Sequence, residues 1–444
     1  MTALNKNFVK LLSTTLVLTL VVMMLATNAY AMPAKPGLFD SKTGLSVTTG
    51  DPLPKLPDGV DEPEKISYKV IGTRNAIVIL VEFTDNPADK ITHTPVDYYN
   101  LLFSTGTYPT GSMNDYYQEI SYNNFSVNGT ITQWYTAPQT YSYYTNGKYG
   151  FGSYPQNAQK LVEDAVILAD PVIDFSNYDK DGNGFVDALF VIHAGPGAEE
   201  TGNANDLWSH KWTTRRPISV DGVKVFVYSM EPEEHINGKL ISMGVFAHEF
   251  GHVLGLPDLY DTDYSSEGIG NYGLMSGGGW GADGKSPWRP AQMCAWSKIK
   301  LGWIVPTVVK NNIIQQPIDN IEQNPTVYKL WTNGNPGKEY FLVSNRQKIG
   351  FDSRFPGSGL LIWHIDDSVS NNNNENHKLV DLEEADGKDD LDYARNRGDA
   401  GDFYNIVNNA IFDDKSYPNS KAYDGTPTNV AVTNISASGD PMYA

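Results

Sequence analysis

The amino-acid sequence predicts an α+β protein in which a mixed domain, residues 73–304, is followed by a smaller all-β domain, residues 305–444. Two observations lead to this division. Up to Trp303, short apolar runs typical of buried strands alternate with segments of helical periodicity. After Trp303, strand-like runs follow one another between turns rich in Asn, Gly and Asp. A mixture of helices and strands within one segment is typical of an α+β architecture.

Residues 1–31 are expected to be a secretory signal peptide. Two lysines precede an apolar run from residue 11 to residue 26, and Ala29 and Ala31 frame a small-x-small cleavage site. A membrane anchor is the alternative, but the run is short for a bilayer span and a cleavage site follows it. Residues 32–72 are rich in Pro, Gly, Lys and Asp and lack core periodicity, which predicts a propeptide or linker.

The overall composition narrows the class of protein. The formal net charge is -19, so nucleic acid and anionic membranes are poor partners, whereas an acidic surface suits calcium. Cys294 is the only cysteine, so the folded chain must depend on its core and on metal ions rather than on disulfides within it. We expect a secreted, extracellular monomer with no membrane attachment after signal cleavage.

Local sequence patterns predict each strand and helix of the mixed domain. The runs at residues 76–85 and 186–195 are almost entirely apolar, as in strands that are buried on both faces. Residues 125–135 alternate between apolar and polar side chains, which is typical of a strand. Ser112 is a suitable N-cap for a short helix that has Asp115 in its first turn.

Helical spacing recurs at residues 157–170, where Leu161, Ala165 and Leu168 share one face. In the second domain the strand-like runs are residues 326–331, 339–347, 359–366 and 429–436. The asparagine-rich residues 371–376 and the acidic residues 381–392 are expected to be loops between such strands.

A helix with two histidines is the strongest functional signal in the sequence. Residues 245–263 read VFAHEFGHVLGLPDLYDTD, and His248 and His252 are two of only eight histidines in the chain. Positions four apart lie on one face of a helix, so both imidazoles can bind one ion, and imidazole nitrogen is a usual ligand of zinc. Phe246 and Phe250 fall on the opposite face, where they can pack into a core.

The residues after the second histidine predict a complete catalytic zinc site. Such a site takes three protein ligands and keeps a fourth position for water. Gly255 can adopt a positive φ that ends the helix, and Pro257 prevents the helix from resuming, so the turn can return Asp258 to the ion as third ligand. Glu249 then stands beside the metal, where a general base would take a proton from the bound water and pass it to the leaving nitrogen.

Other interpretations of this stretch stay open. A His-Glu-x-x-His pattern also arises by chance, and the two histidines could be hydrogen-bonded residues of a core. Glu267 could serve as the third zinc ligand, although that choice leaves Gly255 and Asp258 without a purpose. Met275, in the glycine-rich NYGLMSGGGW, fits a turn that places a methionine beneath the metal, although a lone methionine is usually part of a core.

Long strings of the sequence resemble the immune inhibitor A-type secreted metallopeptidases, also called thuringilysin-like. They include NDYYQEISYNNFSVNG, DKDGNGFVDALFVIHAGPGAEETG, HEFGHVLGLPDLYD, GNYGLMSGG and WSKIKLGW, with EYFLVSNRQKIGFD and GSGLLIWHID nearer the C-terminus. The resemblance implies a metzincin-like zinc endopeptidase made as a secreted zymogen, with a β-rich module behind it. Some metzincins steady the oxyanion with a tyrosine two residues after the turn methionine. That position is Gly277 here, so His210 and Tyr272 are the candidates.

A second metal site is predicted in the stretch DKDGNGFVD. Calcium prefers carboxylate and carbonyl oxygens that alternate along a tight loop, and the stretch offers such oxygens with Gly184 at the sixth position. The expected calcium ligands are Asp179, Asp181, Asn183 and Asp187. Phe190 stands where an EF-hand has its bidentate glutamate, so the loop is no true EF-hand, and a merely polar turn is the alternative. Asp261 and Asp263 offer a possible further calcium site.

The combined prediction is a secreted zinc endopeptidase that hydrolyses peptide bonds in extracellular proteins. A non-catalytic surface-binding protein with a structural metal site is the alternative, and an amidase acting on non-peptide substrates is a third. We expect the propeptide to inhibit the enzyme. Cys294 follows the active site in the sequence, so a cysteine switch is excluded, and a carboxylate of Asp51, Asp58 or Asp61 could cover the metal instead.

Overall fold

A six-stranded sheet organises the first part of the computed structural model, which describes residues 30–38 and 69–444. Its strand order is β1-β5-β6-β4-β2-β3. The strands are β1 (Tyr30–Ala31), β2 (Gly72–Glu82), β3 (Phe125–Thr136), β4 (Ala188–Pro196), β5 (His210–Val220) and β6 (Val223–Glu234). Strands β3, β2, β4 and β6 run parallel, whereas β5 is antiparallel to β6 and β1 is antiparallel to β5. The expected signal peptide, apart from β1, lies outside the described residues, as do Asp51, Asp58 and Asp61.

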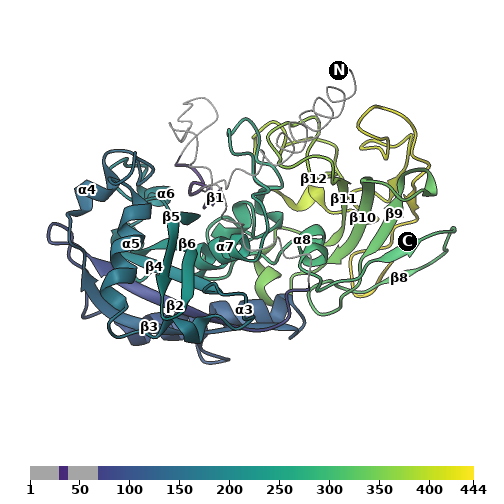
Figure 1. The fold of residues 1–444 in the computed structure, drawn as a ribbon. Coiled ribbons are helices and arrows are strands. Elements are labelled where there is room, and N and C mark those ends of the chain that lie inside the picture. Colours follow the sequence, from purple (N-terminus) through teal and green to yellow (C-terminus); the bar gives the residue numbers. More distant parts are fainter. Residues whose placement is uncertain (1–29, 39–68) are drawn as a thin grey trace, which may run out of the picture.

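Helices cover both faces of this sheet (Figure 1). They are α2 (Pro95–Phe103), α3 (Met113–Ile120), α4 (Tyr141–Thr145), α5 (Ala158–Ala169), α6 (Ala198–Thr201), α7 (Met243–Val253) and α8 (Ala295–Lys300). Alternate residues of β2 belong to two different apolar clusters, Val78 to the one that contains α7 and Ile79 to the one that contains α5. Burial on both faces explains why β2 and β4 read as continuous apolar runs.

The expected local patterns of this part are confirmed. Ser112 caps α3, and its side chain accepts the Asp115 N–H in a capping box. The predicted helix over residues 157–170 is α5, which begins after the cap Asn157. The short 3-10 helices of this part are Phe175–Tyr178, Gly270–Tyr272 and Gly277–Trp280.

After Lys300 the described chain contains strands and 3-10 turns only. A five-stranded sheet has the order β12-β11-β10-β9-β7, and two pairs of short strands, β13 with β14 and β15 with β8, lie beyond it. The strands are β7 (Thr307–Val309), β8 (Pro317–Ile318), β9 (Tyr328–Trp331), β10 (Glu339–Arg346), β11 (Gly359–Asp366), β12 (Val380–Leu382), β13 (Ile411–Phe412), β14 (Val432–Thr433) and β15 (Met442–Tyr443). The 3-10 helices here are Thr332–Gly334, Gly350–Arg354 and Ala400–Asp402.

The two parts share one apolar core across the predicted boundary at residue 304. Leu342 of β10 and Trp363 of β11 belong to the same buried cluster as Phe246 and Phe250 of α7. The opposite face of the second sheet has its own cluster, to which Phe341 and other β10 and β11 residues belong. Figure 1 shows the two sheets with α7 and α8 between them. The C-terminal strands therefore pack directly against the part that carries the histidine helix.

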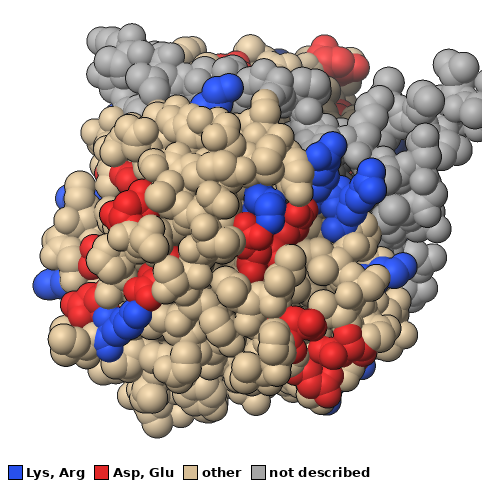
Figure 2. Space-filling model, turned by 60° about the vertical axis from the view of Figure 1, so that its left-hand side comes forward, with Lys and Arg blue, Asp and Glu red and all other residues tan. Residues whose placement is uncertain are grey.

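Charges of both signs are mixed on the molecular face drawn in Figure 2, where tan, uncharged surface predominates. The net charge of -19 is thus not concentrated into one acidic field on this face. None of the helices in the described part of the chain combines the length and apolar character needed to cross a bilayer.

His364 of β11 occupies a charged site inside the second sheet. Its ring stacks between Phe341 and Tyr423, with centroid distances of 4.3 and 4.1 Å. Its Nε2 lies 3.0 Å from Glu339 Oε1, and its Nδ1 lies 3.3 Å from Glu383 Oε1. Although burial lowers the pKa of His364, these two carboxylates outweigh that effect and raise it to about 9.

We expect His364 to make the stability of the protein depend on pH in the alkaline range. A histidine whose pKa is raised on folding stabilises the fold fully below its unfolded pKa of about 6.5, and this contribution is lost as the pH rises toward about 9. The loss amounts to about 3 kcal/mol between roughly pH 6 and pH 10. Urea unfolding at several pH values should show a smaller fall for His364→Gln than for the wild type. Equal slopes would contradict this account.

Candidate metal centre

Close backbone contacts fix the position of helix α7 relative to the neighbouring loops. Gly244 donates its N–H to Pro287 O at 3.0 Å, and a Cβ at this position would overlap with the carbonyl oxygen of Gly279. Phe246 and Phe250 face the sheet, where both rings contact Phe190 of β4. A helix that is fixed in this way presents the side chains of its other face with little freedom.

The structure brings His248, His252 and Asp258 to one point. His248 Nε2 and His252 Nε2 lie 3.1 Å apart, and Asp258 Oδ1 lies 3.3 and 3.1 Å from them. As expected, the helix ends just before Gly255, whose φ is +98°. The N–H of Gly255 caps His252 O at 3.0 Å, and the chain then turns back to place Asp258 opposite the imidazoles.

Hydrogen bonds on the far side of each ring determine which atoms face this point. His248 Nδ1 lies 2.8 Å from Leu274 O, and His252 Nδ1 lies 2.8 Å from Leu256 O. Carbonyl oxygens only accept, so each Nδ1 carries the proton and each neutral ring turns an unshared electron pair on Nε2 toward the other. Two such nitrogens and a carboxylate oxygen repel one another unless a cation lies between them. The three side chains therefore fit a metal ion.

Glu249 lies beside these three groups and is fully buried. Neither of its carboxylate oxygens makes a hydrogen bond of normal geometry to a described residue, although the main chain of Met32 lies close to them. Burial raises the pKa of Glu249 well above its ordinary value, the nearby Glu231 and Asp258 raise it further, and the main chain of Met32 opposes the rise. A buried carboxyl group without partners is costly, and such groups occur mainly where they serve a function.

Met275 packs directly against α7. A Cβ on Gly251, which stands between Glu249 and His252, would overlap with the Met275 sulfur. The neighbouring carbonyls are used as well, since Leu274 O accepts from His248 and Met275 O accepts the Leu259 N–H at 2.7 Å. The methionine turn thus supports both the first histidine and the chain that leads to Asp258.

The other candidate residues lie in different surroundings. Glu267 forms an ion pair with Arg397, with Oε2 and Nε 2.8 Å apart. Tyr272 donates its hydroxyl to Asp402 Oδ2 at 2.6 Å and stacks on Phe355. His210 Nδ1 and Nε2 lie 2.7 Å from Trp208 O and 3.0 Å from the Tyr228 hydroxyl, so both ring nitrogens have partners.

The predicted calcium loop gathers three of its four expected ligands. Asp179, Asp181 and Asp187 offer carboxylate oxygens close enough to hold one cation, whereas the Asn183 side chain accepts the Phe185 N–H. Burial raises the pKa of Asp187 to about 6, and the neighbouring Asp181 adds to this rise. Asp261 accepts the Asp263 N–H at 3.0 Å, as Asp179 accepts the Gly184 N–H at 2.9 Å, but Asp261 belongs to no such group of three ligands among the described residues.

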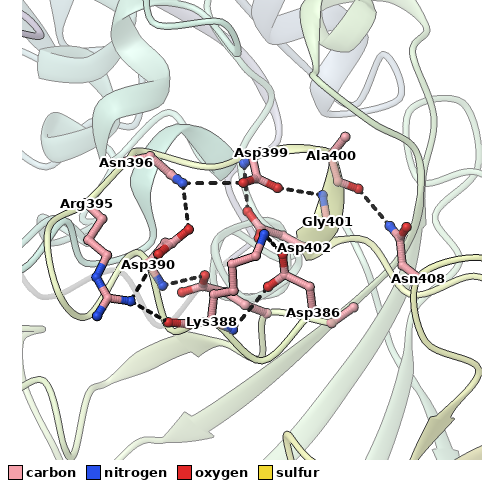
Figure 3. Close-up of polar contacts among 12 residues, drawn as sticks. Asp386, Lys388, Asp390, Arg395, Asn396, Asp399, Ala400, Gly401, Asp402 and Asn408 are labelled. Atoms are coloured by element: carbon pink, nitrogen blue, oxygen red, sulfur yellow. Dashed lines mark hydrogen bonds and ion pairs between the residues drawn. The ribbon is translucent and has the colours of Figure 1, made fainter.

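A further acidic cluster, which the sequence did not single out as a site, lies in the predicted loop after residue 381. Figure 3 shows its carboxylates, Asp386, Asp390, Asp399 and Asp402, around Lys388 and Asn396. Lys388 Nζ donates to Asp386 Oδ2 at 2.6 Å, and Asn396 Nδ2 donates to Asp390 Oδ2 at 3.0 Å. These bonds hold the loop together, and through Asp402 the loop also holds Tyr272.

The C-terminal part braces the turn that carries Asp258. Asn372, which is fully buried, donates to Leu259 O and to Val380 O, both at 2.8 Å. The next residue, Asn373, bonds to the Thr262 hydroxyl. The asparagine-rich loop was expected to be a mere connection, and only the tertiary structure shows that it supports the candidate site.

Residues 30–38, here called the covering segment, lie beside the site. Met32 is fully buried, with its N–H bonded to Ser209 O at 3.1 Å and its carbonyl accepting from Trp208 Nε1 at 2.8 Å. The Pro33 carbonyl accepts from Trp280 Nε1 at 2.9 Å. The Ala31 carbonyl accepts the Tyr260 hydroxyl at 2.6 Å. The predicted signal cleavage point after Ala31 falls inside this segment.

Comparison with known proteins agrees with this geometry. The family described as "Immune inhibitor A peptidase M6, catalytic domain" matches residues 67–304, more than half of the chain. The pre-pro-metalloprotease PrtV of Vibrio cholerae is 31% identical over 316 residues, 58% of this chain and 33% of that protein. Immune inhibitor A of Bacillus thuringiensis subsp. alesti is 33% identical over 253 residues, 46% of this chain and 36% of that protein. The chain thus spans about a third of the length of these relatives. Because the family match covers residues 67–304, which include the histidine helix, the chain belongs to the immune inhibitor A family of M6 peptidases.

Proposed function

We propose that this protein is a secreted zinc endopeptidase that hydrolyses peptide bonds in extracellular proteins. The observation that carries the proposal is the convergence of two imidazole Nε2 atoms and a carboxylate oxygen beside a partner-free glutamate. Two histidines and an aspartate suit zinc, and three protein ligands leave a fourth position for water or substrate. Zinc bound there would supply a Lewis acid and a more acidic water. Membership of a peptidase family and similarity to a protein named metalloprotease support the reaction class.

Residues of the chain would bind the metal and transfer the proton. His248, His252 and Asp258 would hold the metal. Hydrogen bonds to the main-chain carbonyls of Leu274 and Leu256 fix the ring orientations of His248 and His252, respectively. Glu249 would take a proton from the attacking water and deliver it to the nitrogen of the leaving peptide. Its burial favours this exchange, because a carboxylate with a raised pKa is a stronger base.

A non-catalytic surface-binding protein is the second candidate. A structural zinc site is closed by four protein ligands, and the described part of the chain brings only three together here. Nor would a structural site require a fully buried glutamate with no hydrogen-bond partner beside it. Both features favour catalysis.

We further propose that the covering segment keeps the enzyme latent. Its residues 32–38 lie in the region expected to be propeptide, and it buries Met32 next to Glu249. Lys35 adds an ion pair with Glu200, with Nζ and Oε1 3.0 Å apart. A peptide that already occupies the space over the metal ligands would exclude other peptides. The signal-like N-terminus supports secretion, and extracellular proteins or peptides are the proposed substrates.

Calcium is proposed as a stabilising ion at Asp179, Asp181, Asn183 and Asp187. Three carboxylates lie together there on a tight loop, and their mutual repulsion would be relieved by a divalent cation. The loop leads into β4, so an ion there would stabilise the entry to a central strand. The Asp261 and Asp263 loop supports no such proposal, because among the described residues it does not bring three ligand groups together.

A first prediction from this proposed function tests the catalytic role of Glu249. We expect Glu249→Ala to keep the zinc and to lower kcat on casein by about 10³-fold or more, because the general base is lost. His248→Ala should lose both zinc and activity, and a chelator should abolish wild-type activity. Zinc content by atomic absorption and casein digestion measure these effects. Glu267→Gln is the matched control and should retain zinc and activity. A Glu249→Ala protein that still digested casein would refute the mechanism.

The second prediction tests latency through the covering segment. Met32→Asp places a charge in a fully buried apolar position and should release the segment, so that casein is cleaved without the lag that the proposal predicts for the wild type. Lys35→Ala is the control, because a half-exposed ion pair contributes only about 0–1 kcal/mol. N-terminal sequencing would show which form is active. Unchanged latency in Met32→Asp would exclude this role for the segment.

The third prediction tests the calcium loop. Calcium at about a hundred times its Kd should stabilise the protein by about 2.7 kcal/mol, which raises the melting temperature by several degrees. Asp181→Asn should remove this shift while leaving zinc content unchanged. The same experiment with Asp263→Asn serves as control and should show the wild-type shift. If calcium shifts the melting temperature of Asp181→Asn as much as that of the wild type, the ion binds elsewhere.

A further inference from the structure

The covering segment adopts the conformation of a bound extended peptide. Strand β1 pairs antiparallel with the edge strand β5, with Tyr30 opposite Lys211 and Ala31 opposite His210. The hydrogen bonds of Met32 and Pro33 continue this attachment along the segment. Edge strands commonly bind extended peptides in this way, through main-chain bonds that any sequence can make. The segment therefore marks the path that a substrate main chain can follow over the site.

One peptide bond of the segment, between Ala31 and Met32, has Tyr260 on one side and Glu249 on the other. On its carbonyl side, Ala31 O accepts a hydrogen bond from the Tyr260 hydroxyl at 2.6 Å. On its nitrogen side, the main chain of Met32 lies beside the Glu249 carboxyl group. The Tyr260 ring itself is a neighbour of His248, with centroids 6.5 Å apart. The Ala31 carbonyl and the Met32 main chain are thus held beside the candidate site, where the main chain of a substrate would also lie.

We propose that Tyr260 is a catalytic residue whose hydroxyl donates a hydrogen bond to the carbonyl oxygen of the peptide bond being cleaved. This inference rests on the proposed peptidase function. Tyr260 follows Asp258 on the same turn, and the neighbouring Leu259 carbonyl is held by Asn372. The hydroxyl is therefore fixed relative to the candidate metal ligands, which is what stabilisation of a developing charge requires.

The bond changes can be assigned to the residues present. As the water oxygen bonds to the carbonyl carbon, a water proton passes to Glu249 and the C=O electron pair moves onto the carbonyl oxygen. The hydrogen bond from Tyr260 strengthens because its acceptor becomes anionic. When the C–N bond breaks, the electron pair returns to form the carboxyl group, and the nitrogen receives the proton from Glu249. Tyr260 keeps its own proton throughout.

The earlier oxyanion candidates, His210 and Tyr272, are bonded elsewhere. The Tyr272 hydroxyl is bonded to Asp402 and to Asp399 O, at 2.6 and 2.9 Å. Both ring nitrogens of His210 have partners that belong to or adjoin β5 and β6. Tyr260 is the residue whose hydroxyl contacts a carbonyl of the covering segment. The position two residues after Met275 is a glycine, so a donor from another turn is required.

Tyr260→Phe in the zinc-loaded, processed enzyme tests the proposal. Loss of one such donor should lower kcat on a peptide substrate by about 10²-fold to 10³-fold, with KM changed less than about threefold and zinc content unchanged. A phosphinic peptide, which imitates the tetrahedral state, should bind more weakly by a similar factor. In a Glu249→Ala background, an uncleaved peptide should bind Tyr260→Phe and Tyr260 proteins about equally, because the hydroxyl acts mainly on the charged state.

Tyr98→Phe is the matched control. Its hydroxyl is buried and donates to a main-chain carbonyl, Glu233 O at 3.2 Å, away from the covering segment. Tyr98→Phe should have kcat and phosphinic-peptide affinity within about twofold of the wild type, since it loses one ordinary hydrogen bond. If Tyr260→Phe retains wild-type kcat while Glu249→Ala is inactive, the proposal for Tyr260 is wrong and the peptidase function stands. If the wild-type zinc enzyme cleaves no peptide, the proposed function itself fails, and this inference with it.

Discussion

The structure depends on the convergence of three electron-pair donors at one point beside helix α7. His248 and His252 are each protonated on the nitrogen that faces a main-chain carbonyl, so their unprotonated nitrogens face one another at 3.1 Å with Asp258 alongside. Without a cation this arrangement is electrostatically unfavourable, and it persists because rigid surroundings hold every member. A metal ion turns the same repulsion into binding energy. Chelation and folding should therefore be coupled in this protein.

Support for this point comes from segments that are far apart in the sequence. The glycines of α7 allow the helix to lie against residues 275–287 at backbone distance, and the methionine turn supplies a carbonyl to His248. Asn372 reaches from the C-terminal part to the carbonyl of Leu259. The C-terminal strands share the core of α7, so they complete the peptidase part rather than simply follow it. A change deep in the second sheet can reach the metal ligands through these contacts.

The main-chain groups of the edge strand β5 can pair either with β1 or with an extended substrate. Strand β5 would expose unpaired main-chain groups if nothing lay beside it, and β1 satisfies part of that edge. The same groups are those that an extended substrate would use. Under the proposed latency, the covering segment and a substrate would compete for one set of hydrogen bonds. Removal of the N-terminal segment would then open the site.

Local patterns in the sequence were enough to predict the strands β2, β3 and β4, the helices α3 and α5, and the histidine helix, because period and capping are properties of neighbouring residues. The spacing of His248, His252 and Asp258 likewise predicted a common point, since four residues make one helical turn and Gly255 permits the reversal. Other features depend on contacts between residues that are far apart in the sequence, and no short-range pattern predicts those contacts. Tyr260 meets Ala31, Asn372 meets Leu259, and the core extends across residue 304 only after the chain has folded. The sequence by itself determined which residues could bind a metal and activate water. The tertiary structure decided which hydroxyl meets the Ala31 carbonyl beside them, because that relation is set by packing between segments that the sequence keeps far apart.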